Sequence, residues 1–480
     1  MTGQAAGAPD PRRWKALALL CLAFFMVILD AQIVILGLPS IEEDLGFSAG
    51  GAQWVMSAYL LSFGGLLLLG GRSADLLGRR RMFMIGTGLF LVASLLCGLA
   101  WSGGVLIGAR VAQGVSAAIM APTALSILMT TFDEGPERNK ALGIWSAIGG
   151  VGATAALLIG GPLTDGLGWE WIFFINIPVA LLLLGLGPIL LRESRGDVPE
   201  RAYDLSGAVA VTAALVLLVY AVVEAPDAGW GDAQTIGLLI ASALLFALFV
   251  LVENRTASPL VPLRIFRSRT LVGGNLVLAA LGMVAFGMSL VVSMYAQQVL
   301  GYSALEFGLG TTVMTVMAVI GSTSGQAIVT RTGFRWVAAV GLLLTGAGCL
   351  LLTQVSAHGS YLGDIFFGLL IFGPGLGAAY VAASVATLAG VAAGESGLAS
   401  ALNNAAFQIG GAIGTAVVTT VAVSEADGPD PLSALTEGFQ SAFAAAAVFS
   451  ALGFLFAVLL LGKPRGPARM GAEPAGATAD

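Results

Sequence analysis

The sequence predicts an all-α, polytopic membrane protein with fourteen transmembrane helices. Of its 480 residues, 57% are hydrophobic and only 10% are charged, whereas an ordinary soluble protein carries about 25% charged residues. Long apolar segments recur at short intervals along the chain, and all but one of the basic residues lie in the terminal segments or in alternate connections between the apolar segments. A soluble fold of this composition could not cover its surface with polar groups, but lipid is a solvent that tolerates such a surface.

A spanning helix needs about 20 mostly apolar residues, and this length defines the expected spans. The first apolar segment is too long for the core of a signal peptide and no small-residue cleavage site follows it, so we expect it to span the membrane. The segments that meet the requirement are 15–38, 51–71, 81–101, 104–130, 140–163, 171–191, 205–224, 233–252, 271–297, 305–329, 336–356, 361–389, 397–423 and 438–461.

The basic residues predict the orientation of these spans. With the N-terminus in the cytoplasm, every cytoplasmic segment holds Lys or Arg and the outer loops hold none, as the positive-inside rule requires. Of the 22 basic residues, Arg110 alone lies well inside a span, and the others lie in cytoplasmic segments or at the cytoplasmic ends of spans. A wrong helix count would move later basic residues to the outside, so we expect a multi-pass protein of the cell membrane with both termini cytoplasmic.

The expected organisation is six helices, two inserted helices and six more helices. The two sets of six would be related by an axis along the membrane normal. A faint internal repeat agrees, since GRSADLLGRRR after the second span is echoed by GQAIVTRTGFR after the tenth. The predicted divisions are a cytoplasmic N-terminus (1–14), a six-helix bundle (15–191), cytoplasmic loops with two inserted helices (192–270), a second six-helix bundle (271–461) and a cytoplasmic tail (462–480).

Composition also limits the chemistry. The net charge of −6 argues against nucleic-acid binding. Cys21, Cys97 and Cys349 lie in apolar runs and are expected to be small buried side chains, and His358 is the one histidine of the chain. We therefore expect no metal site, no catalytic site and no cofactor.

Asp30 and Arg110 are the ionisable residues that lie well inside predicted spans, at a similar depth of roughly 10 Å below the outer surface. Charged groups inside a bilayer are costly and usually functional. Burial favours the neutral form of a carboxylate and a nearby cation favours the ionised form, a balance that proton-coupled carriers use. We expect a proton or substrate site in which the two side chains meet. The alternative is a static ion pair that fixes helix packing.

The segment from Gly71 to Arg81 is the second candidate site. It combines a glycine helix end, Asp75, a turn at Gly78 and the arginines Arg79 and Arg80. An acid near a helix N-terminus, paired with a neighbouring arginine, can hold helices together on the cytoplasmic side. The alternative is a set of basic residues that anchors the chain by the positive-inside rule.

This segment resembles the cytoplasmic motif of the major facilitator superfamily, and five further segments resemble its fourteen-helix drug:proton antiporter branch. They are LDAQIVILGLPSI (29–41), QWVMSAYLL (53–61), RVAQGVSAAIMAP (110–122), GWEWIFFINIP (168–178) and SGLASALNNAAFQIGGAIG (396–414). The resemblance covers nearly the whole chain. It implies the major facilitator fold, with two six-helix bundles, two inserted helices, a central cavity and alternating access.

The chain departs from the branch at several positions. The fifth span of an antiporter usually carries a Gly-Pro pair where this chain has Ala156-Leu157, and its later Gly161-Pro162 is not at the equivalent position. Phe407 and Glu170 stand where arginine is usual, and Gln32 and Ile35 replace the more usual polar pair of the first span. These changes concern the substrate and its coupling to protons, not the fold.

The resemblance also implies which residues line the central cavity. For single Met and aromatic residues, ordinary helix packing is the alternative, and for the amides it is hydrogen bonding between helices. The candidates are Gln32, Trp54, Tyr59, Gln113, Asn275, Met288, Tyr295, Gln297, Phe372, Tyr380, Asn403, Asn404 and Gln408.

The leading function is export of a small hydrophobic or amphipathic compound, such as a drug, antibiotic or metabolite, in exchange for protons. The partners would be this small molecule, protons and the lipid bilayer, and we expect a monomer. The alternatives on the same fold are an uptake permease, a uniporter or a lipid translocator. A membrane-embedded enzyme or sensor is disfavoured, because no nucleophile arrangement or metal cluster is evident.

Overall fold

The computed structural model describes residues 11–47, 49–132, 136–195, 205–229, 231–256, 259, 263–389, 396–424 and 430–462, and the regular structure within them is helical. The N-terminal group of helices is α1 (Arg13–Leu45), α2 (Ala49–Ala52), α3 (Trp54–Leu77), α4 (Arg79–Gly98), α5 (Gly103–Thr131), α6 (Pro136–Leu167), α7 (Trp171–Phe174) and α8 (Asn176–Leu190). The middle of the chain forms α9 (Leu205–Ala228), α10 (Ala233–Arg255) and a 3₁₀ turn, η1 (Leu263–Arg267). The C-terminal group is α11 (Arg269–Met294), η2 (Tyr295–Val299), α12 (Ala304–Thr332), α13 (Phe334–Leu352), η3 (Tyr361–Ile365), α14 (Phe366–Leu388), α15 (Ser396–Ser424) and α16 (Pro431–Leu460).

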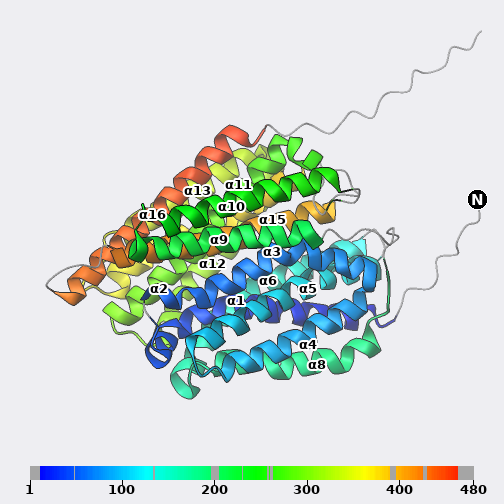
Figure 1. Cartoon of the computed structure of the whole chain (residues 1–480), viewed down its shortest axis with the longest axis horizontal. Helices are drawn as coiled ribbons and strands as arrows, with labels where there is room; N and C mark the ends of the chain where they lie inside the picture. The colour runs from blue at the N-terminus through cyan, green and yellow to red at the C-terminus, as the bar shows by residue number, and fades with distance from the viewer. Residues whose placement is uncertain are drawn as a thin grey trace, which may run out of the picture.

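The long helices lie side by side, and both ends of the described chain come to the same end of the molecule (Figure 1). We call this the termini end and the opposite one the far end. Within the N-terminal group α3 packs on α5, α4 on α5 and α1 on α6. Within the C-terminal group α11 packs on α15, while α12 and α13 pack on α14.

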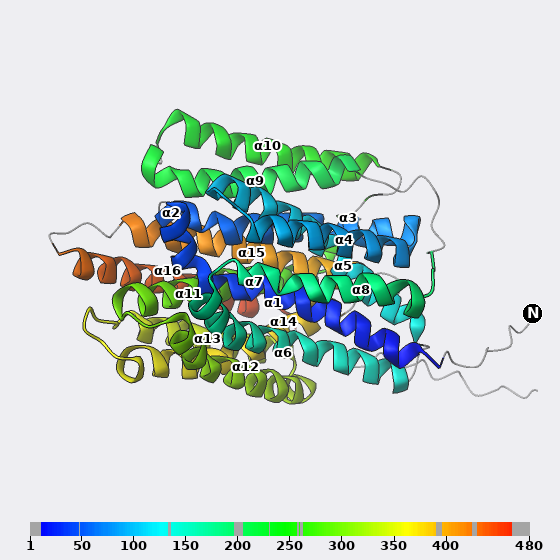
Figure 2. The same ribbon diagram turned by 90° about the horizontal axis from the view of Figure 1, so that it is seen from below.

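The helices α9 and α10 pack on each other and form a separate layer beside the two groups (Figure 2). Of this pair, α9 contacts both α3 and α15, which belong to different groups. At this contact Thr212 of α9 lies against Gly65 of α3. The pair therefore covers the seam between α3 and α15.

Eleven helices of the described chain are long and apolar enough to cross a membrane. Many of their large apolar side chains face outward, among them Leu89, Leu244 and Leu350, which are 47%, 64% and 58% exposed, and such a surface suits contact with lipid. The chain is thus a multi-pass membrane protein. The predicted spans 51–71, 140–163 and 205–224 coincide with α3, α6 and α9 but are not among the eleven, so the count of fourteen stays a prediction.

The segment 71–81 differs from the expected loop. Residues up to Leu77 continue α3, and α4 begins at Arg79, so Gly78 is the single residue between two helices. Gly78 has φ 107°, in the region that favours glycine because a Cβ would be strained there. At the equivalent place in the other group, Gly333 with φ 83° separates α12 from α13. This shared one-residue turn supports the internal repeat.

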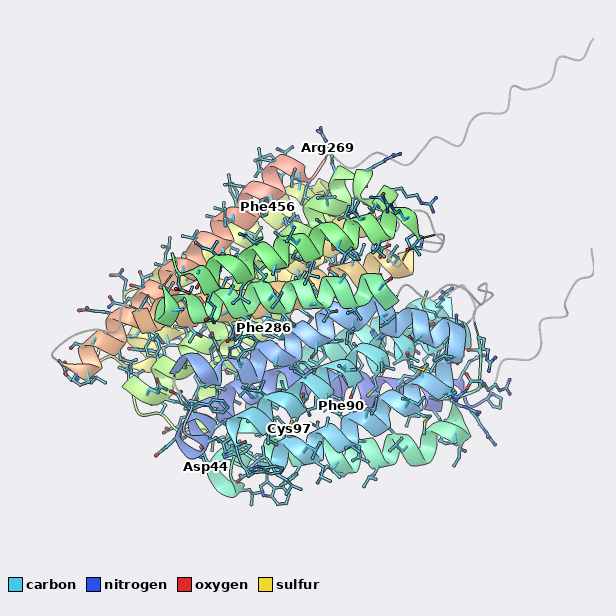
Figure 3. The ribbon with its side chains drawn as sticks, in the orientation of Figure 1. Asp44, Phe90, Cys97, Arg269, Phe286 and Phe456 are labelled. Carbon is cyan, nitrogen blue, oxygen red and sulfur yellow. The ribbon has the colours of Figure 1, made fainter. Side chains whose placement is uncertain are left out.

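The two ends of the molecule differ in charge. Basic side chains lie where helices meet the termini end, and acidic ones such as Glu42, Asp44 and Asp165 lie where helices meet the far end. Figure 3 labels Asp44 and Arg269 at opposite ends. The segments that join helices at the far end contain no Lys or Arg in the sequence.

Side-chain hydrogen bonds join the two groups in the half of the molecule nearer the far end. Ser57 of α3 and Thr415 of α15 share a hydrogen bond of 3.0 Å, and the hydroxyl of Ser293 donates to the Ile35 carbonyl at 3.0 Å. The Asp165 carboxylate, near the end of α6, accepts backbone N–H groups from the first turn of α12. The two groups are therefore held together at the far end.

Candidate functional site

Asp30 and Arg110 form an ion pair inside the N-terminal group. Nη1 of Arg110 donates to Oδ2 of Asp30 at 2.7 Å, and the side chains are 1% and 0% exposed, respectively. Asp30 lies on α1 and Arg110 on α5. The predicted meeting of these two side chains is thus present in the structure.

Two side-chain amides hold the other carboxylate oxygen. Oδ1 of Asp30 accepts a hydrogen bond from Nε2 of Gln113 at 3.1 Å and another from Nδ2 of Asn176 at 2.8 Å. Gln113 comes from the same helix as Arg110, one turn along, and Asn176 is the first residue of α8. Asp30 therefore accepts three hydrogen bonds, one at Oδ2 and two at Oδ1.

The guanidinium of Arg110 is held on several sides. Its Nε donates to the Val55 carbonyl at 2.9 Å, and its Nη1 also donates to Oε1 of Gln113 at 2.8 Å. Its carbon lies 4.3 Å from the centre of the Tyr59 ring and 5.7 Å from that of Phe173. A planar guanidinium suits this combination of forked donation and stacking, which a lysine could not reproduce.

Gln113 extends the cluster to α4. Its Nε2 donates to the Ser94 hydroxyl at 2.9 Å, and its Oε1 accepts from the thiol of Cys97 at 3.1 Å. Cys97 is labelled in Figure 3 on the N-terminal group. Four long helices and the start of α8 thus meet in one polar cluster, which we call the Asp30 cluster: Asp30, Tyr59, Ser94, Cys97, Arg110, Gln113 and Asn176.

The Asp30 cluster holds a carboxylate and a guanidinium among apolar helices, where charged groups are costly and usually functional. Besides Asp30, the guanidinium has the Val55 carbonyl, Gln113 and the Tyr59 ring as partners. In the described chain, no group of three His, Cys, Asp or Glu residues could hold a metal ion.

The other predicted cavity residues are spread over the structure. Two of the amides, Asn403 and Gln408, are 8% exposed, and their side-chain oxygens have no hydrogen-bond partner. The neighbouring Asn404 is exposed and donates to Ser400 within its own helix. Asn275 likewise donates to the Leu271 carbonyl within its helix, and its side-chain oxygen has no partner.

The predicted aromatic and remaining residues mostly have packing partners. Trp54 faces Tyr220 of α9, with ring centres 6.1 Å apart, and Tyr380 packs edge-on against Phe407 at 5.3 Å. The hydroxyl of Tyr295 donates to the Ser356 carbonyl at 2.8 Å. Met288 and Phe372 are fully buried, Gln297 donates to Ser293, and Gln32 is half-buried on α1.

At the termini end, an acid different from the expected one joins the basic motif. The carboxylate of Glu193, just after α8, accepts the backbone N–H groups of Arg80 and Arg81 at 3.1 Å each. It also lies 3.8 Å from Nε of Arg80. Glu193 therefore caps the N-terminus of α4. Gly71 and Arg79 lie on α3 and α4, whereas the Asp75 side chain, for which this role was predicted, is outside the described side chains.

Sequence reasoning missed several members of these sites. Asn176 stands inside GWEWIFFINIP, where it is the polar residue of an apolar run, and that contrast could have marked it. Ser94 and Cys97 are too common in membrane helices to stand out, and Glu193 lies in a polar segment with other charges.

A comparison of the sequence with models of known protein families gives one match. The family model of the Major Facilitator Superfamily matches residues 20–322 and 274–477, which together span nearly the whole chain. The chain belongs to the Major Facilitator Superfamily. The family resemblance inferred from the motifs is therefore confirmed, and this major facilitator protein is a membrane transporter by family.

Several curated relatives of this major facilitator protein are named as resistance or export proteins. It is 40% identical over 382 residues to the puromycin resistance protein pur8 of Streptomyces alboniger, covering 79% of this chain and 76% of that protein. It is 36% identical to the tetracenomycin C resistance and export protein of Streptomyces glaucescens (77% and 68% covered). It is 38% identical to the cephamycin export protein CmcT of Amycolatopsis lactamdurans (73% of each covered).

Solved structures agree on the fold. A bacterial homologue of the human lysosomal transporter Spinster, in an inward-facing and unoccupied conformation, matches with a TM-score of 0.67 at 18% identity, over 96% of this chain and all of that one. The transporter PepTSo of the POT family matches with a TM-score of 0.66 at 14% identity, over 92% and 97%. At these identities the likeness concerns the fold alone.

Proposed function

We propose that this protein exports a small, largely apolar antibiotic-like compound from the cytoplasm in exchange for protons. The observation that carries the proposal is the Asp30–Arg110 ion pair, 2.7 Å long and excluded from solvent inside an apolar helical assembly. Such a pair is costly in a membrane and has a use if its acid changes charge during a cycle. The curated relatives named for puromycin, tetracenomycin and cephamycin favour export over uptake.

The proposed architecture has fourteen spans with both termini in the cytoplasm. The N-terminal and C-terminal groups are then two six-helix bundles, with α9 and α10 inserted between them in sequence. The concentration of Lys and Arg at the termini end supports this orientation. In it, the far end faces the outside of the cell.

The proposed mechanism is alternating access. The hydrogen bonds that join the groups near the far end support a state closed to the outside. In this state Asp30 is ionised, held by Arg110, Gln113 and Asn176. The compound binds between the bundles, where the unpartnered amide oxygens of Asn275, Asn403 and Gln408 and the aromatic side chains of α11 and α14 supply contacts. Protonation of Asp30 from the outside then accompanies release and resets the carrier.

The test uses inverted membrane vesicles loaded with a pH-sensitive dye, with puromycin as the probe compound. We expect puromycin to release protons from energised vesicles that contain the wild-type protein and not from those with Asp30→Asn. Glu253→Gln is the matched control, because Glu253 is also a buried carboxylate on a long helix but lies on α10, away from the Asp30 cluster; it should retain the response.

Two outcomes would contradict the proposal. Puromycin transport by the wild type without any proton movement would instead indicate a uniporter. An unchanged proton response in Asp30→Asn would remove Asp30 from the coupling.

A further inference from the structure

The two oxygens of the Asp30 carboxylate have different partners. Oδ2 accepts a hydrogen bond from Nη1 of Arg110 at 2.7 Å. Oδ1 accepts hydrogen bonds from the side-chain amide nitrogens of Gln113 at 3.1 Å and of Asn176 at 2.8 Å. A guanidinium has donors and no acceptor. A proton on Oδ2 would therefore face a donor that cannot accept it, so the proton taken up by Asp30 belongs on Oδ1, where the neighbours are neutral amides.

Of these two amides, Gln113 is fixed at both of its ends. Its nitrogen donates to Asp30 and to the Ser94 hydroxyl, and its oxygen accepts from Arg110 and from the Cys97 thiol. Turning this amide over would place donor against donor at Arg110. Gln113 therefore keeps its orientation whichever form of Asp30 is present.

Asn176 is held differently. In the described structure, its side chain makes one hydrogen bond, the one to Oδ1 of Asp30, and the residue is 1% exposed. The terminal torsion of an asparagine is broad, so its amide can turn over at small cost. With its nitrogen toward Asp30 it donates to the carboxylate, and with its oxygen toward Asp30 it accepts from the protonated acid.

We propose that Asn176 is the positioning residue that matches the Asp30 site to both protonation states, and that its side-chain amide turns over when Oδ1 takes up a proton. The inference deepens the proposed function, since it rests on Asp30 as the proton site. The proton comes from water and forms an O–H bond at Oδ1, and the charge of Asp30 changes from −1 to 0. Arg110 meanwhile keeps the Val55 carbonyl, Gln113 and the Tyr59 ring as partners.

The titratable and charged groups that face Asp30 are few. Arg110 comes from α5, Tyr59 from α3 and Cys97 from α4. The hydroxyl of Tyr59 donates to the Val27 carbonyl at 3.3 Å, and the Cys97 thiol donates to Gln113. None of them contacts Asn176 through a hydrogen bond in the described structure, so a change at Asn176 acts on Asp30 directly.

The test is an infrared pH titration of the purified, reconstituted full-length protein, which needs no transported compound. The difference between wild type and Asp30→Asn isolates the carbonyl band of protonated Asp30. The first variant, Asn176→Leu, has nearly the same shape but cannot form hydrogen bonds. The second, Asn176→Asp, places another carboxylate against the first. The matched control is Thr123→Val on α5, where the buried hydroxyl bonds to Ile119 within its own helix.

We expect the titration midpoint in Asn176→Leu to rise by about one pH unit, because the lost hydrogen bond to the charged carboxylate is stronger than the lost hydrogen bond to the neutral acid. In Asn176→Asp it should rise further, because two adjacent carboxylates share one proton. The band in Asn176→Leu should also move to higher frequency, since the acid loses its acceptor. Thr123→Val should titrate as wild type does.

A wild-type midpoint and frequency in Asn176→Leu would overturn the inference, and Asn176→Asp gives a second measurement should the leucine variant not fold. These results are separate from those that bear on the proposed function. If Asp30→Asn kept its proton coupling in the vesicle assay, the proposed function itself would be contradicted. If Asp30→Asn lost coupling as expected but the Asn176 variants titrated as wild type does, the inference alone would be contradicted.

Discussion

The carboxylate of Asp165 accepts a hydrogen bond from the backbone N–H of Leu305 at 3.0 Å, although the two residues lie in different groups of helices. The neighbouring N–H of Ala304 donates to the same carboxylate at 3.3 Å. Asp165 thus caps α12 from outside its own group. The contact between the two groups at the far end is therefore also part of the cap of a helix terminus.

Replacing Asp165 with alanine should therefore favour opening of the far end. Loss of such a cap costs about 1 kcal/mol, so the ratio of open to closed molecules should rise roughly fivefold. Pulsed electron paramagnetic resonance between spin labels at Leu167→Cys and Leu362→Cys would measure it, since both are exposed at the far end. Asp364→Asn is the control, because Asp364 bonds only within the C-terminal group in the hydrogen bonds seen for it. Unaltered distances in Asp165→Ala would refute the coupling.

Gly161 lies at the same contact and should not tolerate a side chain. A Cβ there would lie 2.6 Å from the backbone nitrogen of Leu305, a clash with backbone that cannot be relieved by a rotamer change. We expect Gly161→Ala to hinder closure and to lower puromycin efflux by about tenfold, since overpacking costs roughly 1–3 kcal/mol. Gly166→Ala on the same helix is the matched control, because a Cβ there meets nothing within 4 Å. Equal efflux by the two variants would show that the close approach is unimportant.

Arg110→Lys should keep the positive charge and still impair coupling. A lysine cannot donate at once to Asp30 and to the Val55 carbonyl, contacts that Arg110 makes through Nη1 and Nε. We expect proton-coupled puromycin transport to fall by tenfold or more, measured as initial rates in inverted vesicles. A control is Arg195→Lys, on an exposed residue at the termini end, which should transport as wild type does. Wild-type rates in Arg110→Lys would show that charge alone suffices.

Glu193→Ala should destabilise the protein by about 1–2 kcal/mol. The substitution removes the acceptor of the Arg80 and Arg81 N–H groups at the start of α4. Thermal unfolding in detergent should show a midpoint a few degrees lower than that of the wild type. Arg195→Ala, two residues along, changes the charge of the same segment without touching the cap. The cap would be irrelevant if both variants unfolded at the wild-type temperature.

The fold was largely predictable because hydropathy and charge act on long segments. Apolar runs such as 233–252 are set by the lipid solvent, and the concentration of the basic residues other than Arg110 at one end follows the positive-inside rule, both independently of the partner helix. The helical continuation through residue 77 was not predictable, since a basic, glycine-containing segment is compatible with a loop or a helix. The single break falls at Gly78, where Glu193 from a distant part of the chain supplies the cap.

For the candidate site, the sequence predicted the charged pair but not the residues that form hydrogen bonds with it. Asp30 and Arg110 stand out because charges are rare in apolar segments. The contact of Asn176 with Asp30 depends on how α8 packs beside α1, which no local pattern encodes. The partners of the other cavity candidates, such as Tyr295 and Trp54, likewise depend on packing between distant helices.

The acidic far end has an electrostatic consequence for the medium next to it. Carboxylates such as Asp44 and Asp430 lie there, and the hydrogen bond from the Ser433 hydroxyl lowers the pKa of Asp430 below its usual value, so it stays ionised in moderately acidic medium. The resulting negative surface potential raises the local proton activity about threefold for each kT. It also repels anionic molecules from the same face. Salt that shortens the Debye length would weaken both effects.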